Sequence, residues 1–377
     1  MDIFLSAGEA SGDLHGSNLA RAIWSIAPQT RLSCLGGPHM RNAGVPVVVD
    51  NRSISVVGAS EVLSHIRAAY HSWCKIRSHL LSNPPDLVVL IDFPDFNIFL
   101  GKFAKKTGSK IFYYISPQVW AWREGRINSI KRMVDRMAVI LPFEQAFYRA
   151  RGMEVDYVGH PLVDVLDSEP GEALSREKYR SDFSGPLIGL LPGSRKSEIK
   201  LLFELLMDSA QRIHTRLPDA RFIIPVAPSL NQRDIKDLAA RWNFPLQIVS
   251  DDTYGVIRSC DLILTASGTV TLEAAIIGTP MIITNRVSRL SGKIGRRMIR
   301  VKHIGLPNLI ADCEIVPEFV QETAQAEFIA ERAISMLQNP AYLEQQREEF
   351  RRIHVRLGEP GTAERIAQLV LKTARGG

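Results

Sequence analysis

Apolar residues occur along the first half of the chain in short runs that alternate with stretches of helical periodicity. After Leu14, the residues Leu19, Ile23 and Ile26 recur with the 3.6-residue period of a helix, and a longer helix is expected over 61–81. The short runs are expected to be strands at 3–5, 31–35, 87–91, 110–115 and 137–141. This alternation predicts right-handed βαβ units and a parallel sheet.

The same alternation restarts after residues 159–186, a stretch rich in Pro, Gly and charge that is typical of a domain linker. Strands are expected at 187–191, 221–226, 246–249, 262–264 and 281–283, with helices from Ser194 and over 328–337 and 362–373. With 377 residues the chain can build two cores. We therefore expect an α/β fold of two doubly wound, Rossmann-like domains whose sheet edges face a cleft. The expected divisions are an N-terminal domain 1–168, a C-terminal domain 186–345, and helices over 346–377 that pack on the first domain or on a partner subunit.

Composition is that of a globular protein, with 45% apolar and 23% charged residues, but the charge is basic. Lys and Arg total 46 against 40 Asp and Glu, which favours phosphorylated substrates, an anionic membrane surface or nucleic acid as partners. We expect no signal peptide and no membrane-spanning segment. The four scattered cysteines have no metal-site spacing, so they are expected to be free thiols in a reducing compartment.

Two turns in the second half have the features of anion sites. In LLPGSRKSEI, Gly193 and Ser194 form a turn at a helix start, where Ser194 is expected to cap the helix and Arg195 adds a forked cationic donor. In ASGTVTLE, a second helix starts at Ser267, Gly268 and Thr269, and Glu273 follows one turn later, where it could accept hydrogen bonds from a ribose diol. Together they predict a nucleoside-diphosphate site. The alternative is two ordinary capped helices, with Glu273 favoured there by the helix dipole.

The first half carries acids where an anion would otherwise bind. The opening loop FLSAGEASGDLHG contains Glu9, Ser11 and Asp13 but no G-x-G-x-x-G motif, and IDFPDFN places Asp92 at the end of an apolar strand. Partial desolvation there would raise the basicity of a carboxylate. We expect this domain to bind a neutral or hydroxyl-bearing group and to supply a base from one of these two loops. The catalytic candidates are Asp92, Glu9 and Ser11. Asp92 could instead hold the neighbouring loop, and Asp95 is expected to cap the next helix.

A third loop, YYISPQVWAWREGR, follows another expected strand. Its side chains are expected to contact a sugar face or an acyl chain of the acceptor, although burial between helices is the alternative for one of the tryptophans. The candidates are Gln118, Trp120, Trp122 and Arg123.

At this point the sequence resembles the lipid-A-disaccharide synthase family. The resemblance rests on blocks that occur in the family's order over most of the chain: AGEASGD, IDFPDFN, SPQVWAWR, LPFE, VGHPL, LLPGSR, ASGTVTLE and LPNLI. It implies a two-Rossmann (GT-B) glycosyltransferase that joins UDP-2,3-diacylglucosamine to 2,3-diacylglucosamine 1-phosphate through a β-1,6 linkage, with inversion and release of UDP. The resemblance also implies that the enzyme acts at the cytoplasmic face of the bacterial inner membrane.

The resemblance also assigns residues. Asp92 falls on the family's essential aspartate, Arg195 on the arginine associated with the nucleotide, and Ser267, Glu273 and Asn308 on donor-side positions. No cofactor and no metal are expected, because the sequence has no D-x-D acid pair placed for metal assistance.

Residues 274–311 contain no Asp or Glu but many cations interleaved with apolar residues. This pattern favours an interfacial helix at an anionic membrane, with a solvated basic helix as the alternative and nucleic acid as the rival ligand. The 61–81 helix is a second membrane candidate, and a second copy of the chain is a further candidate partner. The cations assigned to the membrane are Arg286, Arg289, Lys293, Arg296, Arg297 and Arg300.

Three other functions compete with the synthase interpretation. One is a UDP-N-acetylglucosamine 2-epimerase of the same architecture, and another is transfer to a different lipid-linked sugar. A basic nucleic-acid-binding protein is the non-enzymatic alternative, but the basic stretch is local and no recognisable binding module accompanies it.

Overall fold

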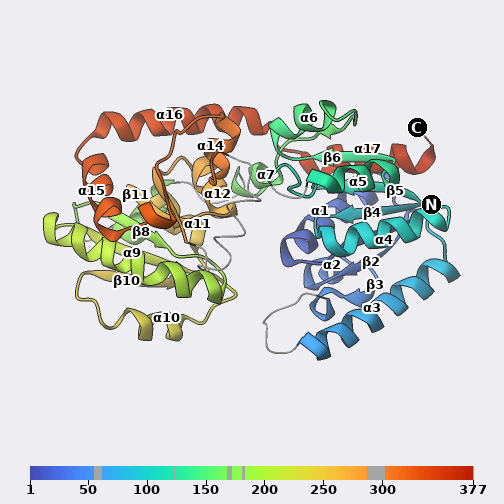
Figure 1. The fold of residues 1–377 in the computed structure, drawn as a ribbon, viewed down its shortest axis with the longest axis horizontal. Coiled ribbons are helices and arrows are strands. Elements are labelled where there is room, and N and C mark those ends of the chain that lie inside the picture. The colour runs from blue at the N-terminus through green and yellow to red at the C-terminus, as the bar shows by residue number, and fades with distance from the viewer. Residues whose placement is uncertain (55–61, 122–123, 168–171, 181–182, 287–301, 377) are drawn as a thin grey trace. The chain divides into compact units, whose positions relative to one another are not determined.

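The computed structural model describes residues 1–54, 62–121, 124–167, 172–180, 183–286 and 302–376 (Figure 1). The chain divides into two compact units. The N-terminal unit comprises Met1–Asp164 together with Leu357–Gly377, and the C-terminal unit comprises Val165–Arg356. The end of the chain therefore belongs to the same unit as its beginning.

The N-terminal unit is built on a parallel sheet of seven strands in the order β3-β2-β1-β4-β5-β6-β7. The central strands are continuous apolar runs, as expected for a sheet covered by helices on both faces. The strands are β1 (Asp2–Ala7), β2 (Arg31–Gly36), β3 (Val47–Asp50), β4 (Leu87–Ile91), β5 (Lys110–Tyr114), β6 (Arg136–Val139) and β7 (Asp156–Tyr157).

The helices of this unit cover the two faces of the sheet, and each face has its own apolar core. On one face α17 packs against α1 and β5, and buries Ile366, Val370 and Leu371 beside Ile3 and Leu5 of β1. The helices are α1 (Ala10–Ile26), α2 (Pro38–Asn42), α3 (Val62–Ser82), α4 (Pro94–Lys106), α5 (Ile127–Met133), α6 (Pro142–Arg149) and α17 (Thr362–Arg375). The division between the units falls within α7 (Pro161–Asp167).

The C-terminal unit repeats this plan with six parallel strands in the order β10-β9-β8-β11-β12-β13. The strands are β8 (Leu187–Leu191), β9 (Arg221–Val226), β10 (Leu246–Ser250), β11 (Leu262–Ala266), β12 (Met281–Asn285) and β13 (Glu318–Val320). The helices are α8 (Glu172–Arg180), α9 (Lys196–Arg216), α10 (Gln232–Ala239), α11 (Thr253–Ser259), α12 (Thr269–Ile277), α14 (Leu306–Ala311), α15 (Ala326–Leu337) and α16 (Pro340–Leu357).

The predicted fold class of two doubly wound α/β domains is confirmed, and the strand order of each sheet locates its binding edge. In both sheets the order reverses between two neighbouring strands, β1 and β4 in one unit and β8 and β11 in the other. Ligands of open parallel sheets bind at such a switch point, beyond the carboxyl ends of the strands. The β1–α1 and β4–α4 turns therefore form the candidate site of the first unit, and the β8–α9 and β11–α12 turns that of the second.

Candidate active site

A glycine allows the two turns at the first switch point to pack closely against each other. Strands β1 and β4 pair in register up to Ala7 and Ile91, so the turns that follow begin side by side. A Cβ on Gly8 would lie 2.0 Å from the Phe93 ring, so only glycine leaves room for that ring over the β1–α1 turn. Glu9 and Ser11 are exposed in this turn, and Asp92 follows Ile91 directly.

Asp92 has an unusual backbone. Asp92 and Phe93 both have φ of 46°, the left-handed region that non-glycine residues adopt only at a cost. The Asp92 carbonyl accepts hydrogen bonds from Asn97 Nδ2 at 2.7 Å and from Tyr113 Oη at 2.9 Å. Asn97 is itself fully buried and accepts a bond from the Ser6 hydroxyl at 2.6 Å. A strained turn held by buried partners fixes the direction of its side chain, as is common at active sites.

The surroundings of Asp92 make its carboxylate unusually basic. Burial raises the pKa of Asp92 to about 6, the negative charge of Glu9 adds to this rise, and a hydrogen bond from the Phe93 N–H opposes it. A carboxylate with such a pKa is ionised at neutral pH yet accepts a proton more readily than an exposed aspartate. This is the property that general-base catalysis requires.

The other two acids of these turns have structural roles. Asp13 is fully buried and accepts hydrogen bonds from the backbone N–H groups of Gly37 (2.6 Å) and His39 (2.8 Å), which ties α1 to the start of α2. It does not offer a base. The expectation that Asp95 caps α4 is wrong, because Phe93 is the N-cap and Asp95, in the first turn, forms an ion pair with Arg126.

The loop after β5 is anchored by Glu144, a residue to which no local sequence pattern gives a role. This carboxylate is buried and accepts hydrogen bonds from the Ser116 hydroxyl at 2.6 Å, the Trp120 indole at 3.2 Å and the Leu141 N–H at 3.0 Å. Burial raises the pKa of Glu144 to about 6, and these three donors oppose the rise. Glu144 thus connects α6 to the loop and positions it.

The acceptor candidates in that loop have different environments. Gln118 is exposed, whereas Trp120 is partly buried and packs edge-on against Phe143 with ring centroids 5.0 Å apart. The side chain of Trp120 is therefore part of the loop's own packing. Trp122 and Arg123 lie outside the described residues.

At the second switch point a pocket of about 730 Å³ opens between the β8–α9 and β11–α12 turns, a size typical of small-molecule sites. It brings together most of the predicted donor residues, as well as the β9 end and the start of α11. The predicted residues that line it are Gly193, Ser194, Arg195, Ser267, Gly268, Thr269 and Glu273.

The start of α9 is capped by its own helix rather than by Ser194. The carboxylate of Glu198 accepts hydrogen bonds from the N–H groups of Ser194 (2.8 Å) and Arg195 (3.1 Å), and Arg195 is the N-cap residue. The expectation of a Ser194 cap is therefore wrong. Glu198 occupies these backbone donors and also pairs with the guanidinium of Arg195, with Nη1 and Oε1 3.6 Å apart. Because the Arg195 side chain is 74% exposed, this pair is weak and the guanidinium can turn toward an anion.

The N-terminus of α12, rather than that of α9, has backbone N–H groups available to bind an anion. Its N-cap is Gly268, which has no side chain to satisfy the first N–H groups, and a Cβ at this position would meet nothing within 4 Å. Backbone N–H groups and the helix dipole at such an end attract phosphate. The neighbouring Ser267 hydroxyl instead donates to the Ile304 carbonyl at 3.0 Å and fixes the turn to the loop before α14.

Glu273 lies in the same pocket, and burial raises its pKa to about 7 while a hydrogen bond from Tyr254 opposes the rise. The carboxylate accepts hydrogen bonds, and its protonated form, which burial favours, can also donate one. A group with that property suits a sugar diol.

Asn308 does not line this pocket. It is fully buried, its Oδ1 accepts from the N–H groups of Ile315 and Val316, and its Nδ2 donates to the Val316 carbonyl and to Glu318. Glu318 also accepts from the N–H groups of Ile304 and Gly305. Asn308 thus organises the loop that Ser267 contacts, and the geometry gives no support to direct donor contact.

The basic stretch lies mostly outside the described residues. Five of its predicted membrane cations are among those not described: Arg289, Lys293, Arg296, Arg297 and Arg300. Arg286 is described, and it donates to the Ala324 carbonyl. No helix within the described part of the chain is long and apolar enough to cross a bilayer. Across the same residues no His, Cys, Asp and Glu cluster has the arrangement of a metal site.

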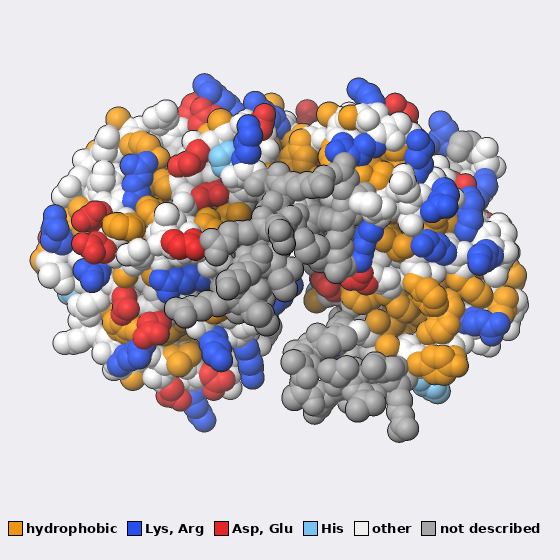
Figure 2. Space-filling view, in the orientation of Figure 1, with side chains coloured by type: hydrophobic (Ala, Val, Ile, Leu, Met, Phe, Trp, Pro, Cys, Tyr) orange, Lys and Arg blue, Asp and Glu red, His pale blue; other side chains and the backbone are white. Residues whose placement is uncertain are grey.

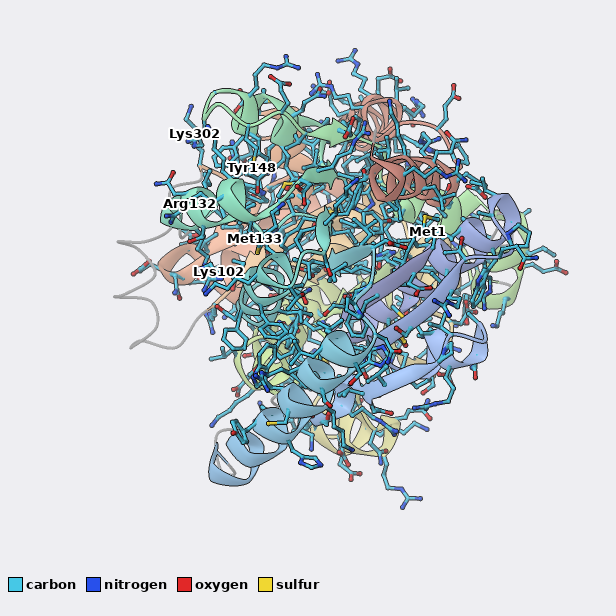
Figure 3. The ribbon with its side chains drawn as sticks, turned by 90° about the vertical axis from the view of Figure 1, so that its right-hand side faces the viewer. Met1, Lys102, Arg132, Met133, Tyr148 and Lys302 are labelled. Atoms are coloured by element: carbon cyan, nitrogen blue, oxygen red, sulfur yellow. The ribbon has the colours of Figure 1, made fainter. Side chains whose placement is uncertain are left out.

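An exposed aromatic patch lies on α3 and α4 of the N-terminal unit. Trp73 packs between Phe99 and Phe103, with ring centroids at 4.4 and 5.1 Å, while Tyr70 is 69% and Phe99 52% exposed. Figure 2 shows hydrophobic side chains gathered over these helices, and Figure 3 shows Lys102 of α4 and Arg132 of α5 at the surface of the same unit. We call Tyr70, Trp73, Phe99 and Phe103 the α3–α4 patch.

Comparison with known proteins places the chain in a family. The family model described as lipid-A-disaccharide synthetase matches residues 3–371. The lipid-A-disaccharide synthase of Geobacter sulfurreducens is 45% identical over 370 residues, which cover 98% of this chain and 96% of that protein. The one from Coxiella burnetii strain CbuK_Q154 is 36% identical over 372 residues, covering 98% and 97%.

Solved structures of low identity share the fold. The UDP-GlcNAc 2-epimerase of Neisseria meningitidis, solved with UDP-GlcNAc bound, has a TM-score of 0.62 at 13% identity and covers 99% of this chain and 100% of that one. The MurG protein of Acinetobacter baumannii has a TM-score of 0.61 at 13% identity, covering 98% and 99%. Epimerases and GT-B glycosyltransferases thus share this architecture, and the sequence relatives decide between them. The chain belongs to the lipid-A-disaccharide synthase family and is a glycosyltransferase of lipid A biosynthesis.

Proposed function

We propose that the protein joins UDP-2,3-diacylglucosamine to the 6-hydroxyl of 2,3-diacylglucosamine 1-phosphate, giving the β-1,6-linked disaccharide 1-phosphate and UDP. The observation that carries the proposal is the placement of complementary chemistry at two switch points. A basic carboxylate, Asp92, stands at the first, and an uncapped helix end with a neighbouring guanidinium, Arg195, stands at the second. These are the groups that an alcohol nucleophile and a diphosphate leaving group require.

In the proposed donor site the diphosphate lies at the N-terminus of α12. The first N–H groups of that helix and Arg195 then neutralise the charge that grows on the diphosphate as the glycosidic bond breaks. Glu273 binds the ribose diol by accepting hydrogen bonds from its hydroxyl groups. Four carboxylates line the pocket. Two of them accept hydrogen bonds from backbone N–H groups at helix starts, Glu198 at α9 and Asp252 at α11.

The proposed chemical step balances within these groups. Asp92 takes the proton of the acceptor 6-hydroxyl while the oxygen attacks the anomeric carbon of the donor. The bond from that carbon to the diphosphate oxygen breaks, and UDP leaves with the electron pair. Attack from the face opposite the leaving group inverts the anomeric centre and gives the β linkage. Glu144 acts at a distance, because its hydrogen bonds to Ser116 and Trp120 fix the loop that presents Gln118, the residue that we assign to the acceptor.

The assay that tests this function supplies UDP-2,3-diacylglucosamine with and without 2,3-diacylglucosamine 1-phosphate. We expect UDP release and disaccharide formation in equal amounts, both dependent on the acceptor. Incubation with UDP-N-acetylglucosamine alone is the control for an epimerase, and we expect no change at C2. Epimerisation without acceptor, or equal turnover with an unrelated lipid-linked sugar, would contradict the proposal.

We further propose that the protein binds the cytoplasmic face of the inner membrane peripherally, because both substrates carry acyl chains. The α3–α4 patch would supply the apolar contact, and Lys75, Arg77 and Lys102 on the same helices the attraction to anionic lipids. Aromatic side chains flanked by cations are typical of such interfaces.

We expect the Tyr70→Ser, Phe99→Ser double variant to lose most of its binding to phosphatidylcholine vesicles that contain phosphatidylglycerol. The measurement is co-sedimentation, with Val355→Ser as the control, since Val355 is an exposed apolar residue of the other unit. Equal binding by the double variant and the control would remove the patch from the interface.

A further inference from the structure

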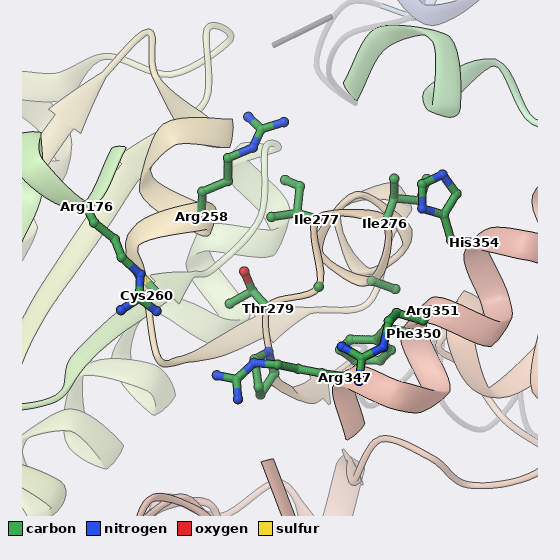
Figure 4. A pocket seen from close by; sticks show the side chains of 13 residues that line it. Arg176, Arg258, Cys260, Ile276, Ile277, Thr279, Arg347, Phe350, Arg351 and His354 are labelled. Carbon is green, nitrogen blue, oxygen red and sulfur yellow. The ribbon is translucent and has the colours of Figure 1, made fainter. Parts of the chain in front are cut away.

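A second pocket, of about 340 Å³, lies in the C-terminal unit and is shown in Figure 4. It is at the opposite edge of the sheet from the proposed donor site. It is formed around the loop between α12 and β12, which leads into the amino end of β12. The donor pocket, by contrast, lies beyond the carboxyl ends of β8 and β11. No step of the proposed reaction uses this second pocket.

Its polar lining is cationic. Four arginines and a histidine from three helices surround Thr279, and no acidic residue is among the described residues that line it. Figure 4 shows these side chains extending from separate elements around the loop. The cations are Arg176 of α8, Arg258 of α11, and Arg347, Arg351 and His354 of α16.

Like charges gathered in this way repel one another, and the internal partners of these arginines compensate only in part. On their own helix, Arg347 pairs with Glu344 and Arg351 pairs with Glu344 and Glu348. The Arg351 pairs are solvent-exposed and of the kind that contributes little to stability, whereas the Arg347 side chain is half-buried. Arg258 gives one N–H to the Leu166 carbonyl and retains further donors. An incoming anion could therefore replace these partners at the guanidinium groups with little loss of stabilising interaction.

The helix ends beside the pocket do not account for the cations of α16. The Ile257 carbonyl of α11 accepts from the Thr279 hydroxyl at 2.8 Å, and the Ser259 carbonyl accepts from Arg180. The end of α12 is closed by the N–H of Gly278, which donates to the Ala274 and Ala275 carbonyls. These carbonyls already accept hydrogen bonds from other groups, so Arg347 and Arg351 are not needed to cap the helix ends.

The remaining lining is apolar and includes Ile276, Ile277, Pro280 and Phe350. A forked cationic rim over an apolar floor matches a phosphate group carried on an apolar or sugar body, because guanidinium groups bind phosphate oxygens two at a time. We propose that this pocket is a second anion site, distinct from the donor site, that binds a phosphate group. The group could come from a soluble phosphorylated compound or from a phospholipid headgroup.

The test uses the full chain saturated with UDP, so that the donor pocket is filled. Titration calorimetry with pyrophosphate is expected to show one further binding event. In the Arg347→Gln, Arg351→Gln double variant this event should weaken about tenfold or more, since two charge-assisted contacts are lost. The charge-matched control is Arg212→Gln with Arg352→Gln, two exposed arginines that do not line the pocket.

A second arm measures binding to phosphatidylcholine vesicles with and without phosphatidylglycerol. Weakened pyrophosphate binding alone identifies a soluble phosphate ligand, whereas weakened vesicle binding, with or without the first effect, identifies a lipid headgroup. If the double variant matches the control in both arms, the proposal is overturned. It is overturned likewise if the unmodified protein shows no second calorimetric event and the double variant binds vesicles as the control does. Because UDP affinity and transfer are measured separately, its failure is distinguishable from failure of the proposed function.

Discussion

Asp92→Asn is expected to lower turnover about 10²–10⁴-fold, the contribution typical of a positioned base. The asparagine keeps the size of the side chain and tolerates the left-handed backbone at this position, but it cannot accept a proton. UDP affinity should stay within error of the unmodified protein, because the donor pocket contains no residue of the β4–α4 turn. The measurements are steady-state kinetics and UDP titration.

The pH profile separates a base from a merely structural aspartate. Because the pKa of Asp92 is raised to about 6, its carboxylate is protonated and inactive below that pH, so kcat/KM should rise through about pH 6 and then level off. Glu9→Gln removes a nearby negative charge and should shift this limb to lower pH while retaining activity. A large loss of activity in Glu9→Gln, with little change in Asp92→Asn, would make Glu9 the base instead.

The melting temperature of the Asp92→Asn variant shows whether a loss of turnover comes from a loss of folding. An aspartate whose pKa is raised on folding costs folding free energy once it is ionised, so at neutral pH the asparagine variant should melt no lower than the unmodified protein. Asp95→Asn is the matched control in the same turn, because Asp95 is exposed and pairs with Arg126. It should retain turnover within a few-fold. Near-normal turnover in Asp92→Asn would remove Asp92 from the role of base.

Arg195→Ala is expected to weaken UDP binding about 10- to 100-fold, the effect of losing a charge-assisted contact to a diphosphate. The helix start should remain intact, since Glu198 caps the backbone N–H groups of residues 194 and 195, which alanine retains. Lys196→Ala is the matched control, an exposed cation one residue further along that does not line the pocket. Equal UDP affinity in the two variants would place the diphosphate elsewhere.

The central strands could be predicted from the sequence because they are buried on both faces and read as continuous apolar runs, whereas their order in each sheet comes from the structure. The strands 87–91, 187–191 and 221–226 have the predicted bounds. The short strands β3, β7 and β13 were missed, since they lie at the margins of the sheets and contain polar residues such as Asp50, Asp156 and Glu318. Burial, and with it the apolar signal, decreases toward a sheet edge.

The candidate residues at strand ends were accessible from the sequence for a different reason. A residue that follows a central strand must lie at the binding edge, so Asp92, Arg195 and Ser267 could be placed from strand position alone. What an acid does there depends on partners distant in the chain. Asp13 is only four positions from Glu9 in the sequence, yet it accepts hydrogen bonds from the backbone N–H groups of residues 37 and 39. Asn97, Tyr113 and Glu144 act through such long-range bonds, which no local pattern reveals.

The most direct test of the account is a crystal structure of the protein with UDP. We expect the diphosphate at the N-terminus of α12 with Arg195 turned toward it, and the ribose within hydrogen-bond distance of Glu273. Electron density for uridine against the β1–α1 turn at Glu9, with the α12 end empty, would contradict the division of work between the two units.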